Sequence, residues 1–522
     1  MGTESISTIA DIIRTHAAER PDAVALETGG RSVTFGELDR RSNQVAHALE
    51  AAGVGTGDRV AFIEKNGLEF FEVTFALAKL GAVNVAVNWR LAPAEMLQII
   101  DDAQSEVLIV GPDFVGHIEQ IEDQLTRVQT MVSIGDHERW ITYESWVADQ
   151  PDDDHGVGVG GSDVAFQLYT SGTTGLPKGV MLTNDNFFQC VTGVAAQWRF
   201  DETSVNLAMM PMFHIAGAGW GMVGLYFGCR TVVMRDIDPP AILRAIPEFG
   251  ITNAFMVPVV IQFLLITPGV DETDFSSLKT LVYGASPITD DVLVKGIETF
   301  GCEFIQVYGL TETTGAITQL DGVDHDPEGR PHLLRSCGRP YPWVELRVID
   351  PDSGEDVTVG RVGELWTRST QNMAGYWNNP EATAQAVTGD GWFKTGDAGY
   401  LDPEGFVFLH DRVKDMIVTG GENVYPAEVE NALMKSPLVA DVAVIGVPDE
   451  RWGEAVKAIV VLAEGAAATE AELIAFAREH LAGFKLPKSV DVAETLPRNP
   501  SGKLLKRELR EPYWEGVDRR VG

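Results

Sequence analysis

The sequence predicts a large α/β protein with parallel sheet and a smaller second domain. Its 522 residues exceed what one hydrophobic core supports, so two or more domains are expected. Short apolar runs rich in β-branched residues alternate with helical stretches, which is the pattern of strands joined by crossover helices. The predicted strands include residues 59–63, 107–110, 231–234 and 281–283, and the predicted helices include 36–51, 70–79 and 290–300.

The pattern changes near residue 401, where a smaller α+β domain is predicted. Two strand-like runs at 439–449 and 455–465 are followed by a helical stretch at 469–483. The charged connector 411–415 precedes them, as expected of a hinge between two domains. We therefore expect an N-terminal domain at residues 1–411 and a C-terminal domain at residues 412–522.

Composition and charge narrow the class of protein. The formal net charge of -36 argues against nucleic acid as a partner, because phosphate backbones require basic surfaces. The segment 478–510 is locally basic, which suits a polyanionic ligand such as a nucleotide or CoA. The chain shows no secretory signal and its four cysteines form no CxxC pair, so reduced thiols and a cytoplasmic location are expected. The apolar stretch 205–229 contains Pro211 and His214 and is interpreted as buried core, so no transmembrane segment is predicted.

The strongest chemical signal is the sequence YTSGTTGLPKGV at residues 169–180. Hydroxyl residues are interleaved with glycines and a lysine follows, so the loop offers backbone N–H groups and short donors to polyphosphate oxygens. It is not a P-loop, because Lys178 is followed by Gly179 rather than by serine or threonine. The candidate phosphate-binding residues are Thr170, Ser171, Gly172, Thr173, Thr174, Gly175 and Lys178.

Charged residues in three further loops suit nucleotide chemistry. Glu312, in QVYGLTETTG, is a candidate ligand for Mg²⁺, which proteins bind through one carboxylate plus substrate phosphates. Asp397 follows a glycine and can accept hydrogen bonds from both hydroxyls of a ribose. Lys503, in PSGKLLKREL, can neutralise a pyrophosphate leaving group, and Lys506 and Arg507 are competitors for this role on the residues alone.

These motifs, in this order, resemble the adenylate-forming superfamily of acyl-CoA synthetases, peptide adenylation domains and beetle luciferases. The resemblance covers essentially the whole chain. Besides the phosphate loop it rests on ALAKLGAVNVAVNWRL (76–91), MPMFHIAGAG (210–219), VYGASPI (282–288), QVYGLTETTG (306–315), GWFKTGD (391–397), DRVKDMIVTGGENVYPAEVE (411–430) and NPSGKLLKREL (499–509). It implies a large N-terminal α/β domain, with parallel-sheet subdomains and a small barrel, followed by a small mobile α+β domain.

The resemblance also implies roles for single residues. Lys503 is implied to be required for adenylation, and Glu312 to hold Mg²⁺. His214 is implied to lie where the acyl pocket meets the CoA tunnel, whereas the residues alone favour a buried, hydrogen-bonded histidine. Nucleotide contacts are implied for Gly284, Ala285, Ser286, Tyr308, Gly309, Thr311, Asp397 and Arg412. A rotation of the C-terminal domain about Lys414 is implied to bring the turn at Gly420, Gly421 and Glu422 to the pantetheine chain.

These roles imply an ATP-dependent carboxylic acid:CoA ligase. The acid is first adenylated with release of pyrophosphate, and the acyl group then passes to CoA with release of AMP. Adenylation needs no general base, because a carboxylate is already ionised at neutral pH. The expected acyl pocket begins at Trp198 and includes 209–223, 283–287 and 309–314; its small residues at 216–219 favour a medium- or long-chain fatty acid.

Alternative functions stay open. The acid could be aryl, branched or polycyclic, and the acceptor could be a carrier protein, although no carrier motif follows in the chain. A fatty acyl-AMP ligase is disfavoured by the short interval between Glu312 and Arg412. A luciferase-like oxygenase shares the same motifs. A catalytically silent binding protein is disfavoured because Lys503, Glu312, Asp397 and Arg412 are all present. A homodimer is expected.

Overall fold

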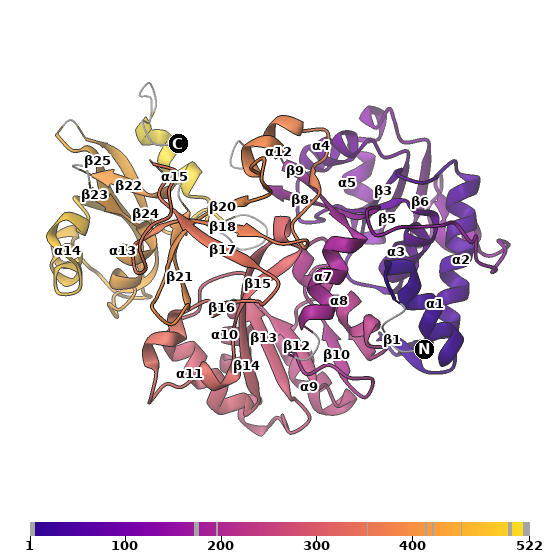
Figure 1. Cartoon of the computed structure of the whole chain (residues 1–522), viewed down its shortest axis with the longest axis horizontal. Helices are drawn as coiled ribbons and strands as arrows, with labels where there is room; N and C mark the ends of the chain where they lie inside the picture. Colours follow the sequence, from indigo (N-terminus) through magenta and orange to yellow (C-terminus); the bar gives the residue numbers. More distant parts are fainter. Residues whose placement is uncertain are drawn as a thin grey trace. The chain divides into compact units, whose positions relative to one another are not determined.

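The α/β fold predicted from the sequence is confirmed in the computed structural model of the chain (Figure 1). The structure describes residues 6–171, 177–194, 197–351, 353–412, 415–419, 422–449, 451–498 and 504–514. The chain divides into two compact units: Met1–Glu345 with Arg368–Phe393, and Leu346–Thr367 with Lys394–Gly522. Each unit is therefore built from two separate stretches of sequence. The domain boundary between residues 411 and 412 stays a prediction.

One half of the first unit is a nine-stranded sheet in the order β16-β15-β14-β13-β12-β10-β11-β1-β2. The strands from β14 to β1 in this order run parallel, and β2, β15 and β16 are antiparallel additions at the two edges. Their bounds are β1 Val24–Thr28, β2 Arg31–Thr34, β10 Val205–Ala208, β11 Arg230–Val233, β12 Asn253–Met256, β13 Thr280–Gly284, β14 Glu303–Leu310, β15 Gly315–Leu320 and β16 Arg339–Pro340.

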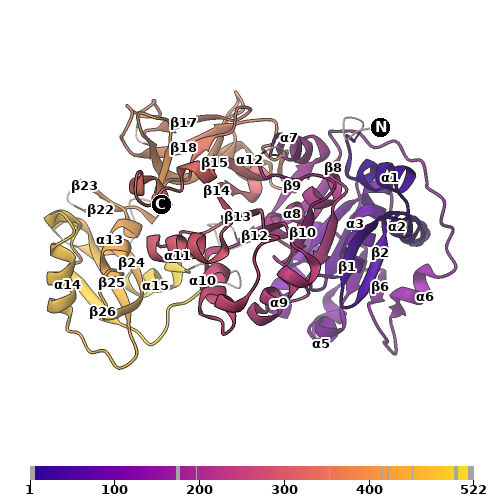
Figure 2. The ribbon, with the colours of Figure 1, turned by 90° about the horizontal axis from the view of Figure 1, so that it is seen from below.

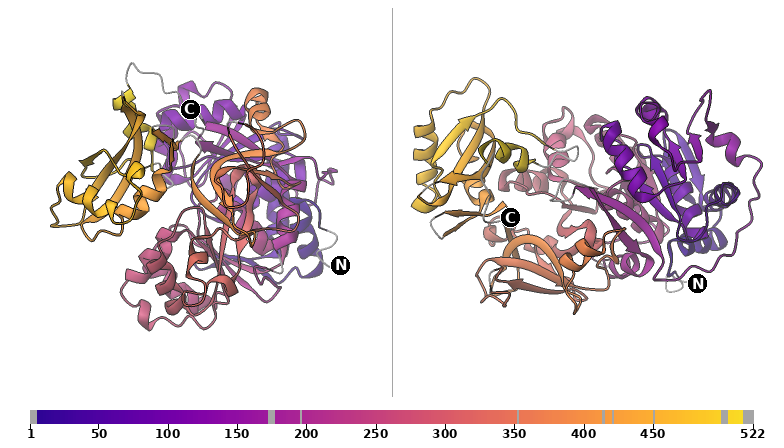
Figure 3. Two further views of the ribbon diagram at one scale, coloured as in Figure 1. Left: turned by 60° about the vertical axis from the view of Figure 1, so that its left-hand side comes forward. Right: turned by 90° about the horizontal axis from the view of Figure 1, so that it is seen from above.

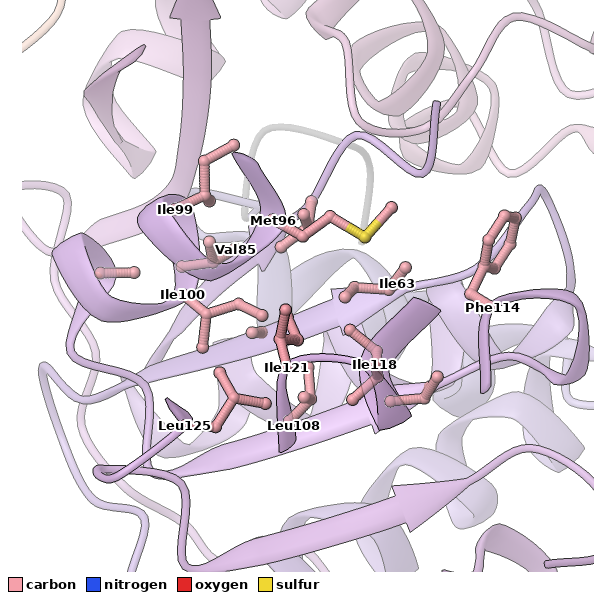
Figure 4. Close-up of a cluster of buried hydrophobic side chains, with 14 of the residues drawn as sticks. Ile63, Val85, Met96, Ile99, Ile100, Leu108, Phe114, Ile118, Ile121 and Leu125 are labelled. Atoms are coloured by element: carbon pink, nitrogen blue, oxygen red, sulfur yellow. The ribbon is translucent and has the colours of Figure 1, made fainter. Parts of the chain in front are cut away.

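The other half is an eight-stranded sheet in the order β19-β9-β8-β4-β3-β5-β6-β7. Its strands β4 and β5 are buried along their whole length, as expected of parallel strands covered on both faces. Met96, Ile99 and Ile100 of α4 (Pro93–Ala103) pack in one core cluster with Val85 and Leu108 (Figure 4). The strand bounds are β3 Arg59–Ile63, β4 Val83–Ala86, β5 Val107–Val110, β6 Thr130–Ser133, β7 Ile141–Thr142, β8 Val164–Ser171, β9 Pro177–Thr183 and β19 Gly375–Tyr376.

Capping residues set the ends of several helices of the first unit. Helix α2 begins after a capping box between Thr34 and Glu37, and α3 ends at Gly81, whose φ of 69° is a left-handed conformation that glycine adopts without strain. Figure 2 shows α1, α2 and α3 grouped together. The bounds are α1 Ile9–Glu19, α2 Phe35–Ala51, α3 Leu68–Leu80, α4 Pro93–Ala103, α5 Val115–Glu119, α6 Tyr143–Val147, α7 Asn184–Val194, α8 Ile215–Tyr226, α9 Pro239–Phe249, α10 Pro258–Ile266, α11 Asp290–Phe300 and α12 Pro380–Ala386.

The apolar stretch 205–229 forms β10 and α8, and most of α8 is buried in the first unit. It is thus a core segment, as its proline and glycines predicted. Among the described residues, no helix combines the length and the hydropathy needed to cross a membrane.

The second unit contains a four-stranded sheet, β17-β18-β20-β21, and a five-stranded sheet in which β26 joins the path β23-β22-β25-β24. Alternate residues of β24 face two cores: Val442 and Val444 pack with α13 and α14, whereas Ala443 and Ile445 pack with α15. Figure 3 shows this layered part in yellow. The bounds are β17 Glu345–Ile349, β18 Gly363–Arg368, β20 Phe393–Leu401, β21 Val407–Arg412, β22 Ile417–Thr419, β23 Glu422–Val424, β24 Val439–Asp449, β25 Gly453–Leu462, β26 Ser489–Val492, α13 Pro426–Leu433, α14 Glu470–Arg478 and α15 Lys506–Trp514.

A buried lysine joins α2 to α3. The side chain of Lys79 is fully buried, and its Nζ donates to Asp39 Oδ1 at 2.6 Å, to Ser42 Oγ at 2.8 Å and to Asn43 Oδ1 at 2.5 Å. Burial lowers the pKa of Lys79 from its ordinary value, while the negative charge of Asp39 opposes this shift. All three protons of the ammonium thus have an acceptor, which is what a buried charge requires.

Replacing Lys79 by methionine tests this polar network. We expect Lys79→Met to lower the free energy of unfolding by about 3 kcal/mol, because Asp39, Ser42 and Asn43 lose a shared donor inside the protein. Urea denaturation measures the effect. The matched control is Lys295→Met, at an exposed position of α11, which should change stability by less than about 0.5 kcal/mol. Equal effects of the two substitutions would contradict the importance of the network.

Candidate active site

The candidate site lies at the carboxyl ends of the parallel strands of the nine-stranded sheet. Strands β10, β12, β13 and β14 run parallel, so the segments that follow them leave from the same edge, which is where α/β sheets bind ligands. His214 follows β10, Gly284 ends β13, and Tyr308 and Thr311 lie at the end of β14 and directly after it. A Cβ atom built on Gly315 would lie 3.8 Å from Ile215 Cγ1, so the turn after β14 contacts the start of α8.

Glu312 is held on a tight turn between β14 and β15. Residues Thr311–Thr313 form a single 3-10 turn, and Thr314 and Gly315 both have positive φ, 52° and 96°. Gln371 Nε2 donates to the carbonyl oxygens of Thr313, at 2.8 Å, and Ala316, at 2.9 Å, which fixes the turn from outside. The turn therefore presents the half-buried Glu312 side chain from a rigid frame.

Three side chains link this turn to the end of the phosphate loop. Tyr376 Oη donates to Glu312 Oε1 at 3.1 Å, and Lys178 Nζ lies 4.9 Å from the centre of the Tyr376 ring. The arrangement follows from strand pairing, because β19 places Tyr376 opposite Val180 of β9, and β9 places Lys178 opposite Thr170 of β8. A cation and a carboxylate are thus brought to one tyrosine.

Sequence reasoning did not find Tyr376. It lies outside the family motifs. Its one local feature is an aromatic residue directly after a glycine, and this combination is too common in proteins to identify a functional residue. Only the pairing of β19 with β9, which joins residues almost two hundred positions apart, identifies its place at Glu312.

The segments proposed to surround the adenine need their glycines. A Cβ on Gly284 would lie 2.2 Å from the Val307 carbonyl oxygen, and one on Gly309 would lie 1.8 Å from the Gly315 carbonyl oxygen. Ala285 adopts a positive φ of 69°, Ser286 is exposed, and Tyr308 is buried. The backbone beside Tyr308 is therefore packed too closely for any larger side chain.

His214 caps the start of α8. Its Nε2 is shielded from solvent and has no hydrogen-bond partner among the described residues, so the hydrogen-bonded histidine favoured by the residues alone is not what the structure shows. Burial, assisted by the positive charge of Arg90, lowers the pKa of His214 to about 4. The ring is accordingly neutral at pH 7 and offers one unsatisfied nitrogen, which suits contact with a ligand.

The residues expected to form an acyl pocket divide into two groups. Trp220 is buried, its Nε1 donates to the Leu207 carbonyl oxygen at 3.1 Å, and its ring packs against Trp198, Phe200 and Phe255. This cluster belongs to the hydrophobic core. A Cβ on Gly217 would lie 2.2 Å from the Pro211 carbonyl oxygen, so this glycine serves close packing. Ile215 and Ala216, at the start of α8, are half-buried and lie outside this cluster.

The second unit holds two further candidates. Asp397 lies in β20 with 8% of its surface exposed, and its backbone N–H donates to Thr395 Oγ1 at 3.0 Å. Its antiparallel partner in β21 is Arg412, so the two proposed ribose contacts are neighbours across a strand pair.

The two residues that compete with Lys503 for its role both have an acidic partner. Lys506 Nζ lies 2.9 Å from Glu430 Oε1, and Arg507 Nε lies 3.0 Å from Glu511 Oε1.

Several sequence predictions lie outside the described residues and stay predictions. They are Gly172, Thr173, Thr174, Gly175, Lys414, Gly420, Gly421 and Lys503. For Ser171, Arg412 and Glu422 the structure describes only the backbone, in β8, β21 and β23.

Comparison with known proteins identifies the family. Residues 13–377 match the AMP-binding enzyme family, and residues 428–503 match the AMP-binding enzyme C-terminal domain. The chain is 40% identical to the fatty acid–[acyl-carrier-protein] ligase ScoC of Streptomyces coeruleorubidus, over 99% of this chain and 98% of that protein. It is 38% identical to a feruloyl-CoA synthase of an Amycolatopsis species, over 94% and 96%. The solved structure of ATP-bound MatB from Rhodopseudomonas palustris superposes with a TM-score of 0.87 at 30% identity, covering 97% of this chain and 99% of that one. The chain belongs to the adenylate-forming family of AMP-binding enzymes and is an AMP-forming acid ligase.

Proposed function

We propose that the chain is a Mg²⁺- and ATP-dependent ligase that joins a medium- or long-chain fatty acid to CoA. The observation that carries this proposal is the convergence of Lys178, Tyr376 and Glu312. Lys178 is the cation for the ATP phosphates, and Glu312 the carboxylate for the metal. The fatty acid is supported by the name of the relative at 40% identity, and CoA by that of the relative at 38%. A cytoplasmic location and a homodimer stay predictions of the sequence.

The site's donor set fits magnesium. Glu312 provides a half-buried carboxylate, and one of its oxygens already accepts from Tyr376, which orients the other. Glu312 would hold Mg²⁺ together with oxygens of the ATP phosphates and water, and the ion would supply charge neutralisation for those phosphates.

The chain's own residues would perform adenylation by positioning. Lys178 and the phosphate loop hold the β- and γ-phosphates while the substrate carboxylate attacks the α-phosphate, and pyrophosphate leaves. Tyr308 and the close-packed backbone at Gly284 and Gly309 hold the adenine. Lys503 stabilises the leaving group. In the second step the CoA thiol attacks the acyl carbonyl carbon, and AMP leaves with the bonding electron pair.

An aromatic acid is the second candidate substrate. The close packing of Gly217 and the core position of Trp220 leave less room beneath α8 than the run of small residues suggested. A shorter, flat acid would need less room, and a relative at 38% identity is named a feruloyl-CoA synthase.

The first experiment measures AMP formation from ATP and Mg²⁺ with octanoate, palmitate, benzoate and ferulate. Each acid is supplied with CoA, with a phosphopantetheinylated carrier protein, or with neither. We expect AMP release that depends on both CoA and a fatty acid. Fastest turnover with ferulate or benzoate would replace the fatty acid by an aromatic one. Turnover that requires the carrier protein would replace CoA as the acceptor.

Neutralising Glu312 tests the metal ligand. We expect Glu312→Gln to lower the rate of acyl-adenylate formation by about 100-fold or more, because the metal loses its protein carboxylate. The rate should be recorded across a Mg²⁺ titration by ATP–pyrophosphate exchange. Glu298→Gln removes an exposed carboxylate of α11 and is the matched control, which should keep the unmodified rate. Equal rates for the two variants would exclude Glu312 as the ligand.

The lowered pKa of His214 predicts a pH-dependent contribution to stability. The unfolded chain protonates His214 near its ordinary pKa, whereas the folded chain protonates it only near pH 4, so stability falls as the pH drops below about 6.5. Between pH 7 and pH 5 this loss amounts to about 2 kcal/mol. In His214→Asn the decrease in unfolding free energy over that interval should be smaller by this amount in urea titrations. An unchanged decrease would show that the folded chain protonates His214 freely.

A further inference from the structure

A cluster of possible metal ligands lies on elements that carry no part of the candidate active site. His47 and Glu50 belong to α2, and His155 belongs to the segment between α6 and β8. One ring nitrogen of each histidine and one carboxylate oxygen of Glu50 all lie within 4.8 Å of one another. His47 and Glu50 are three positions apart on a helix and therefore share a face.

The segment that carries His155 is fixed along α2 by side chains of the helix. Asn43 Nδ2 donates to the Asp152 carbonyl oxygen at 2.8 Å, and His47 Nε2 donates to the Asp153 carbonyl oxygen at 3.0 Å. Farther along the segment, Asp154 accepts from Arg14 Nε at 2.7 Å and from Arg14 Nη2 at 2.8 Å. His155 is therefore positioned by the three residues that precede it.

Each of the two histidines has a ring nitrogen that is available to bind a cation. Because His47 Nε2 carries the proton donated to a carbonyl oxygen, the neutral ring has its lone pair on Nδ1; this is the usual orientation of a metal-binding histidine. The His155 side chain is 8% exposed, and its buried Nε2 has no hydrogen-bond partner among the described residues. Its Nδ1 lies 3.7 Å from Glu50 Oε2, too far for a hydrogen bond.

We propose that His47, Glu50 and His155 bind a zinc ion or a similar first-row divalent metal. Two imidazoles and one carboxylate suit Zn²⁺, and a water completes a tetrahedral set. The centroids of the two imidazole rings lie 3.8 Å apart and their planes are tilted by 35°, so side-chain rotation is needed to point one lone pair of each ring at a shared ion. The ion would join α2 to the segment that leads into β8 and the phosphate loop, as a structural metal does.

Metal binding by the full-length protein tests this site. The chain is prepared without a polyhistidine tag, treated with chelator and kept free of nucleotide. Zn²⁺ binding is then measured by calorimetry, and Co²⁺ binding by visible absorption. We expect one equivalent per chain, with affinity at least about tenfold weaker in His47→Ala, His155→Ala and Glu50→Gln. The control His332→Ala removes an exposed histidine outside the cluster and should bind as the unmodified chain does.

Glu50→Gln guards against a misfolded variant, because this side chain is 61% exposed and its replacement leaves both imidazole rings in place. Circular dichroism checks that each variant is folded. The proposal is overturned if the unmodified chain binds no zinc at micromolar concentrations. It is equally overturned if stoichiometric binding persists in both His47→Ala and His155→Ala, since the ion would then occupy another set of ligands.

Discussion

Parallel pairing of β10, β12, β13 and β14 is the constraint on which the candidate site depends. Parallel strands must end at the same edge, so every segment that follows them begins on one side of the sheet. His214, Gly284 and Tyr308 come from segments up to ninety-odd positions apart, yet no long loop is needed to collect them. The antiparallel addition of β15 then turns the chain back directly after β14, which places Glu312 on a short, rigid turn rather than on a free loop.

Much of the fold and of the candidate site could be predicted from the sequence, because the informative signals are local. The apolar runs at 59–63 and 107–110 became β3 and β5 with the same bounds, and the helix at 290–300 became α11. Glu312 could be proposed as a candidate because its loop is rich in glycine and threonine and matches a family motif over ten residues. Tyr376 was not found, since its contact with Glu312 depends on long-range strand pairing that leaves no local pattern.

The small residues of α8 show how composition can be read in two ways. A run of glycine and alanine predicts either open space or close packing, and sequence cannot separate the two. At Gly217 the backbone of residues 210 and 211 fills the position of a side chain, and at Gly221 the Phe71 ring lies 3.1 Å from where a Cβ would be. The packing density around each small residue distinguishes open space from close packing, and it is known only from the three-dimensional structure.

Each compact unit is built from two separate stretches of sequence, and this determines which recombination events between related enzymes keep a unit whole. Residues Arg368–Phe393, which carry Tyr376, belong to the first unit but are joined at both ends to strands of the second. A single crossover near residue 411 would separate β17, β18, β20 and β21 from the rest of their unit. Recombination that keeps both units whole needs three junctions, beside residues 345, 367 and 393. A single junction at or before residue 345 keeps the second unit whole but divides the first, and a junction at or after residue 393 does the reverse. Every single-junction hybrid therefore mixes parental residues within at least one of the two units.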